Sequence, residues 1–216
     1  MTDWLEIERR DLYAGLTVRV FHEHDGRPPR GRVTMSLDVD DGAGGWHDTG
    51  RAPRWLRPGL AFYPYLERHV DARGRAPRDY RVRVDAELYQ PRYLWELKDG
   101  EVATVHPWDA STPPAVLPAG PLAVALLPRP AHPIDARGPV LRGYVVNPDA
   151  SPVATALVEF DQLQVLTERD GEFALPLPRA PVGMSLIDVA ALDGRTGTFP
   201  VTVPDELRAQ VVFTLT

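Results

Sequence analysis

The chain has 216 residues, among them 23 prolines and 17 glycines, and carries a formal net charge of −6 without any cysteine. A chain of this length forms either one large domain or two of ordinary size, and its dense prolines and glycines leave little room for long helices. The composition therefore predicts an all-β fold, excludes disulfides and thiolate sites, and argues against a general nucleic-acid-binding protein.

The first ten residues alternate charged and apolar side chains and contain no apolar run typical of a signal peptide. No segment reaches the roughly 18 apolar residues that a membrane-spanning helix requires. We therefore expect a cytoplasmic protein that binds no membrane, unless a larger particle carries it out of the cell.

Alternating apolar and polar residues in the first half predict β-strands at residues 16–22, 32–38 and 80–86. Residues 25–29, Asp-Gly-Arg-Pro-Pro, predict the turn between the first two strands. Six consecutive apolar residues at 122–127 predict a final strand before the chain becomes rich in proline. Such strands are typical of an antiparallel β-sandwich.

Arginine and aromatic residues are concentrated between positions 51 and 83, where nine arginines face only three acidic residues. Arginine mixed with Trp and Tyr is typical of protein interfaces, and also of surfaces that stack single-stranded nucleic acid, although the negative net charge disfavours nucleic acid here. The alternative is an ordinary core with solvated arginines outside it. The predicted interface residues are Arg51, Arg54, Trp55, Arg57, Tyr63, Tyr65 and Arg68. The expected partners are other protein subunits with acidic surfaces, and self-association stays open.

Strand and turn patterns follow each other quickly after residue 138, and an Asp-Gly pair at 170–171 predicts a tight turn. We predict that residues 1–127 form a β-sandwich domain rich in arginine and aromatic residues. Residues 128–137 are then a proline-rich linker, and residues 138–216 a second β-sandwich domain.

Three landmarks in the second half have the order Gly143-Tyr-Val145, Pro152-Val-Ala-Thr-Ala-Leu-Val158 and Asp170-Gly-Glu-Phe173. In this order they resemble the carboxypeptidase regulatory-like domain, a transthyretin-like or prealbumin-type β-sandwich. The resemblance covers about 75 residues and implies a scaffold without catalytic groups. A Gly-x-Tyr strand of that family is missing near residue 183, and the first half reads as a diverged copy of the same domain.

Catalytic motifs are largely absent from the sequence. None of the six histidines is followed at the third position by the Glu of a zinc carboxypeptidase, and no serine lies in a nucleophile-elbow motif. We expect no enzymatic activity and no cofactor. His22 and His24 have the His-x-His spacing that intradiol dioxygenases, whose sandwich is related, use for iron, and Asp25 would be the third ligand. A metal-dependent enzyme built on these residues is therefore an alternative.

The leading hypothesis is a non-enzymatic protein that binds other subunits as an accessory component of a multi-subunit assembly. Its combination of patterns resembles components of phage-tail-like contractile particles. A carbohydrate-binding module is the other alternative, because Trp46, Trp95 and the His106-Pro-Trp-Asp109 segment could form an aromatic platform for sugars.

Overall fold

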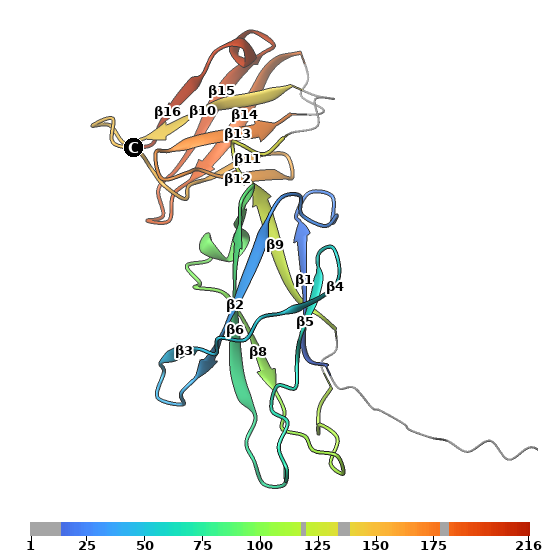
Figure 1. Cartoon of the computed structure of the whole chain (residues 1–216). Coiled ribbons are helices and arrows are strands. Elements are labelled where there is room, and N and C mark those ends of the chain that lie inside the picture. The colour runs from blue at the N-terminus through green and yellow to red at the C-terminus, as the bar shows by residue number, and fades with distance from the viewer. Residues whose placement is uncertain (1–13, 118–119, 134–138, 178–181) are drawn as a thin grey trace, which may run out of the picture.

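The computed structural model describes residues 14–117, 120–133, 139–177 and 182–216, and these are nearly all in strands, turns and loops without an α-helix. No helix of these residues is long and apolar enough to cross a membrane. Figure 1 shows the strands in two groups, which we call the first half (residues 14–133) and the second half (residues 139–216). The all-β class predicted from the sequence is confirmed.

The first half contains nine strands in one sheet and one 3-10 helix. The strands are β1 (Ala14–His22), β2 (Val33–Asp40), β3 (Trp46–Asp48), β4 (Arg54–Arg57), β5 (Leu60–Pro64), β6 (Arg78–Ala86), β7 (Tyr89–Pro91), β8 (Glu101–Val105) and β9 (Leu122–Pro128), and the helix is η1 (Arg92–Leu94). Their order is β3-β2-β6-β7-β9-β1-β5-β4, and β8 pairs with β6.

The centre of this sheet is a parallel pairing between β1 and β9, in which Val18 lies opposite Leu122 and His22 opposite Leu126. The apolar run at residues 122–127 is thus a strand, as predicted. β5 then pairs antiparallel with the other side of β1, and β4 adds outside β5. This arrangement leaves β4 at one end of the sheet.

Side chains from strands near both ends of the sheet pack into a single buried cluster. Leu37 and Val82 come from β2 and β6, and they share this cluster with Val18 of β1 and Tyr63 of β5. Since all four strands belong to one sheet, the sheet must curve around its own core. Alternating residues of each strand face inward, as the period-2 pattern predicts.

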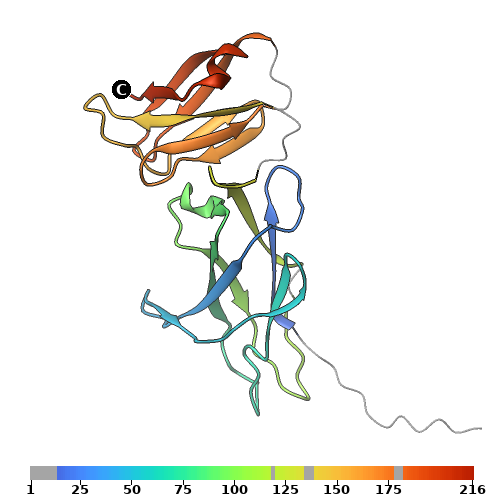
Figure 2. The same ribbon diagram turned by 45° about the horizontal axis from the view of Figure 1, so that its top comes forward.

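The second half contains a three-stranded sheet, β13-β10-β16, and a four-stranded sheet, β12-β11-β14-β15. Its elements are β10 (Val140–Val146), β11 (Leu157–Phe160), β12 (Leu163–Leu166), β13 (Glu172–Pro176), β14 (Gly183–Ala190), β15 (Thr196–Val203), the 3-10 helix η2 (Asp205–Arg208) and β16 (Val211–Thr214). Both sheets contribute to a second buried cluster, in which Phe213 stacks on Phe173 and Phe199 with ring centroids 5.4 and 4.6 Å apart. Figure 2 shows these strands from a second direction.

Two landmarks of the second half have clear structural reasons. Gly171 of the Asp-Gly turn has φ +81°, and a Cβ there would lie 2.5 Å from the carbonyl oxygen of Val145. Gly143 lies within β10 beside the parallel strand β16, where a Cβ would lie only 2.2 Å from the carbonyl oxygen of Val211. Only glycine lets these two strands approach so closely.

Replacing Gly143 by valine should therefore force β10 and β16 apart. We expect the free energy of unfolding to fall by at least about 2 kcal/mol, because the clash is with backbone that cannot rotate away. Urea unfolding followed by far-ultraviolet circular dichroism measures this loss. Gly120→Ala is the matched control, since a Cβ at Gly120 meets nothing within 4 Å. Equal stability of both variants would contradict the close packing of the two strands.

Candidate functional site

The predicted interface residues form one basic, aromatic surface around β4, with one exception. All four side chains of β4 are exposed, and the sheet order places this strand at an outer edge. Trp55 is 43% and its neighbour Leu56 61% exposed, so two large apolar side chains face solvent between Arg54 and Arg57. We call these four residues the β4 edge.

Three further predicted residues extend this surface beside the β4 edge. Arg51 Nη1 donates hydrogen bonds to the carbonyl oxygens of Pro64 and Tyr65, at 3.3 and 3.4 Å. These bonds bring the segment before β4 against the end of β5. The guanidinium of Arg68 lies 5.5 Å from the ring centroid of Tyr65, which is 43% exposed. Arg51, Tyr65 and Arg68 therefore lie together, as the interface hypothesis requires.

Tyr63 does not belong to this surface, and its prediction as an interface residue is wrong. It points inward from β5 and is completely buried in the core of the first half. Burial, together with the negative charges of Asp38 and Asp48, raises the pKa of its hydroxyl to about 12. The period-2 alternation of β5 explains the error, because residues 61 and 63 face the core whereas residues 60, 62 and 64 do not.

The surface is supported by two loops that Trp108 and Asp109 tie together. The indole Nε1 of Trp108 donates to the carbonyl oxygen of Leu66 at 2.8 Å. The backbone N–H of Trp108 donates to the carbonyl oxygen of Glu67 at 2.9 Å. These bonds hold Tyr65 and Glu67 at positive φ values of 58° and 50°, which side chains other than glycine rarely adopt. Trp108 is itself buried, so it holds the loop and offers no platform for a sugar.

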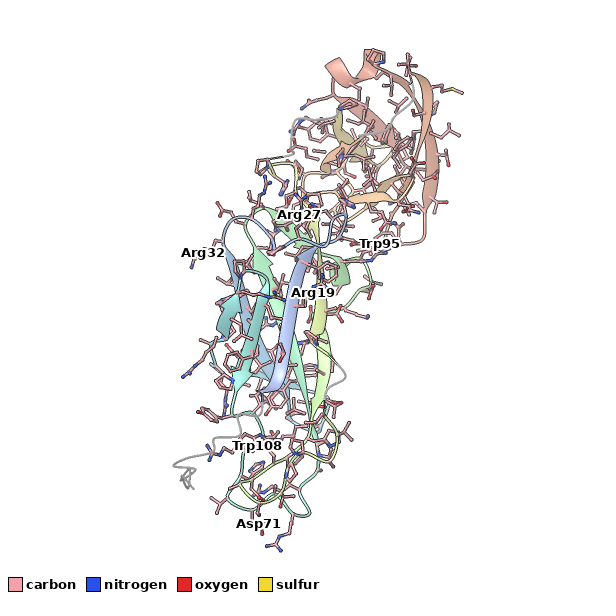
Figure 3. All side chains as sticks on the ribbon, turned by 90° about the vertical axis from the view of Figure 1, so that its right-hand side faces the viewer. Arg19, Arg27, Arg32, Asp71, Trp95 and Trp108 are labelled. Carbon is pink, nitrogen blue, oxygen red and sulfur yellow. The ribbon has the colours of Figure 1, made fainter. Side chains whose placement is uncertain are left out.

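Asp109 is the anchor of these loops. Its carboxylate accepts hydrogen bonds from the backbone N–H groups of Ala72, Ser111 and Thr112 and from the Ser111 hydroxyl, at 2.6 to 2.8 Å. Together these donors, led by the Ala72 N–H, lower the pKa of the carboxyl far below its usual range. Figure 3 shows Trp108 and Asp71 of the neighbouring loop at the end of the first half that is remote from the second half.

A hollow of about 750 Å³ lies beside these loops, with the buried carboxylate of Glu67 in its wall. The Tyr80 hydroxyl donates to Glu67 Oε1 at 2.6 Å, and His69 Nε2 lies 3.0 Å from Oε2. Burial and the contact with Glu67 raise the pKa of Tyr80. Because both oxygens of Glu67 are already engaged, this carboxylate is a structural group rather than an available base.

The metal-ligand candidates lie at the other end of the first half. The rings of His22 and His24 are 5.2 Å apart, and Asp25 Oδ1 lies 3.3 Å from His22 Nδ1. Burial lowers the pKa of His22, and burial together with His22 lowers the pKa of His24 to about 4. In the part of the chain that the structure describes, no group of three histidine or acidic side chains is arranged to hold a metal ion.

The sequence did not single out Leu56 or His132. Leu56 had no signal in the sequence, because its exposure follows from the position of β4 at the edge of the sheet. His132 had none, because it is more than a hundred residues from His22 and meets it only in the folded chain, with ring centroids 5.6 Å apart. The other aromatic candidates, Trp46 and Trp95, are half-buried on different elements.

Comparison with known proteins identifies no family for this chain. No protein-family model and no curated protein matches the sequence. One solved structure with some likeness is titled "The Bacillus anthracis TIE protein", with 11% sequence identity and a TM-score of 0.28. The match covers 92% of this chain but only 32% of that chain, so the present sequence spans about a third of that protein's length. A likeness this weak supports no conclusion about fold or function.

The loops that support the surface can be tested through Asp109. Replacing it by alanine removes the acceptor of four hydrogen bonds, so the chain near Arg73 and Arg75 should open and become a trypsin site. We expect cleavage there to become several times faster. Asp71→Ala is the control on the same loop. Among the described residues, the exposed Asp71 carboxylate bonds only the backbone N–H and the side chain of Arg73, and the Arg75 side chain bonds the Asp71 carbonyl. Equal cleavage of the two variants would contradict the anchoring role of Asp109.

Proposed function

We propose that this protein is a non-enzymatic binding component of a multi-subunit assembly, and that a partner protein docks on the β4 edge. The observation that carries this proposal is a short edge strand with all four side chains exposed, among them Trp55 and Leu56. Proteins usually protect such edges, because the unpaired backbone groups recruit another strand. An edge strand that exposes large apolar side chains is typical of an interaction site.

The charge around the β4 edge defines the chemistry of the partner. Residues 49–66 contain three arginines and no acidic residue. Arginine and tryptophan are enriched among residues that dominate binding energies, and the planar guanidinium binds carboxylates through two parallel hydrogen bonds. A partner that supplies an extended, acidic segment would pair its backbone with β4 and its carboxylates with Arg51, Arg54 and Arg57.

A phage-tail-like particle is one assembly that would use such a component, and this proposal rests on the sequence resemblance alone.

A sugar-binding function has weaker support. Trp108 is buried, and the Trp46 ring is covered by the guanidinium of Arg81, which lies 4.8 Å from the ring centroid. We also propose that residues 1–127, with a single curved sheet, and residues 138–216, with two sheets, are separate domains and that residues 128–137 link them. The two separate buried clusters, one within residues 16–126 and the other within residues 141–215, support this division.

The partner site is tested by the double change Arg54→Glu with Trp55→Ala. It reverses a charge and removes an aromatic anchor, so capture of the partner subunit should weaken by at least about a hundredfold, as expected for two such residues. The melting temperature should stay unchanged because both side chains are exposed. A matched control is Arg169→Glu with Val212→Ala, two exposed positions in the second half. Undiminished capture by the first variant would refute the proposed site.

The domain division is tested by producing residues 138–216 alone. If they form a domain with its own core, the fragment should unfold cooperatively in urea and keep the far-ultraviolet spectrum of a β-protein. A fragment that shows no cooperative transition would contradict the division. The expected midpoint is below that of the whole chain, because the fragment loses the ion pair between Arg129 and Glu168.

A further inference from the structure

The register between β4 and β5 sorts the side chains of the β4 edge by charge. The residues opposite Arg54, Trp55 and Arg57 are Phe62, Ala61 and Leu60 in that order. Leu56 is the extra residue where this register shifts. Opposite residues of a pair point to the same face, and Ala61 is completely buried, so Trp55 lies on the core side of the sheet. Both arginines then lie on the outer side, with Trp55 and Leu56 between them.

This arrangement defines the strand that fits outside β4. Alternate residues of a strand point to the same face, so a matching strand has two acidic residues separated by one apolar residue. The acidic residues face Arg54 and Arg57, and the apolar residue between them faces Trp55. A second copy of β4 does not fit, because it would place arginine opposite arginine, and like charges in that position destabilise a sheet.

The chain contains such a segment immediately before β1. Residues 3–8 are Asp-Trp-Leu-Glu-Ile-Glu, with three acidic and three apolar side chains and no basic residue. Glu6 and Glu8 have the required spacing, with Ile7 between them. Residues 1–13 lie outside the described residues, so the argument for their place rests on this chemistry and on the position of Ala14, where the described chain begins.

The position of Ala14 brings this segment within reach of the β4 edge. Ala14 lies opposite Pro64 at the end of β5, and β1, β5 and β4 lie side by side in this order (Figure 1). A strand outside β4 is three strand spacings from β1, about 14 Å, and Arg54 is level with Thr17, about 10 Å along the strand from Ala14. The direct distance is therefore about 17 Å, whereas the six steps from residue 8 to residue 14 span about 20 Å when extended.

The strand direction agrees with this reach. β1 and β4 both run antiparallel to β5, so they run parallel to each other. A segment outside β4 that leads to the start of β1 therefore runs antiparallel to β4. A contact within one chain also avoids the entropy lost when two molecules associate, which favours this segment over the same segment of another copy.

We propose that residues 5–8 pair antiparallel with β4 of the same chain and cover the β4 edge until a partner displaces them. Glu8 then faces Arg54, Glu6 faces Arg57, and Ile7 covers Trp55. The inference rests on the proposed function, because it makes this segment the competitor of the partner at the same strand. The protein thereby protects its exposed edge while no partner is bound.

Disulfide trapping tests the contact directly, because the chain has no cysteine of its own. Opposite residues of a strand pair are close enough for a disulfide, so Ile7→Cys with Trp55→Cys should oxidise within one chain. The control is Ile7→Cys with Val212→Cys, whose second position is exposed in the second half. Oxidation should be at least about tenfold faster than in the control, as measured by non-reducing electrophoresis and peptide mass spectrometry. Equal rates, or disulfide-linked dimers in place of cross-linked monomers, would overturn the proposal.

Charge reversal in the full chain gives a second test that leaves the β4 edge intact. Glu6→Lys with Glu8→Lys turns two attractive pairs into repulsive ones, so the backbone amides of residues 54–57 should exchange with deuterium at least about fivefold faster. Hydrogen-exchange mass spectrometry measures this rate. Asp85→Lys with Glu87→Lys is the control, because both residues are exposed and have the same spacing at the end of β6. Exchange that is equally fast in the two variants would contradict the covered edge.

Capture of the partner subunit separates this inference from the proposed function. Both readouts above are made without a partner, so they do not depend on whether the β4 edge is the docking site. If the segment competes with the partner, Glu6→Lys with Glu8→Lys should also strengthen capture about fivefold. Weakened or unchanged capture by this variant would overturn the competition, whereas undiminished capture by Arg54→Glu with Trp55→Ala would overturn the proposed function alone.

Discussion

The parallel pairing of β1 with β9 is the constraint on which the rest of this structure depends. It joins residues that are about a hundred positions apart, Val18 with Leu122 and His22 with Leu126. The pairing uses one side of β1 for β9 and leaves the other for β5, so β4 necessarily falls at the end of the sheet. It also delivers the chain at Pro128 beside the end of β1 and close to the second half, whose Glu168 pairs with Arg129. The position of the β4 edge therefore follows from this long-range contact.

The β4 edge combines exposed side chains with a firmly held support. The β4 edge exposes arginine and apolar side chains on a strand that pairs, among the described residues, with β5 alone, which suits a partner that brings a strand of its own. Its neighbours are made rigid by Asp109 and Trp108, which hold two loops against each other through backbone groups. Rigid support lowers the entropy that binding must overcome.

The sequence by itself determined the strands and turns that local patterns encode. Period-2 alternation located β1, β2 and β6, the apolar run located β9, and Asp170-Gly171 located a turn, because these features depend on side-chain spacing and on the positive φ of glycine. It also located Arg54, Trp55 and Arg57, since a local excess of arginine is visible without a fold. Only the tertiary structure decided that Tyr63 is core and Leu56 is surface, because the inward face of a strand is set by what packs against it. The pairing of distant strands likewise placed His132 beside His22, a contact that no local pattern encodes.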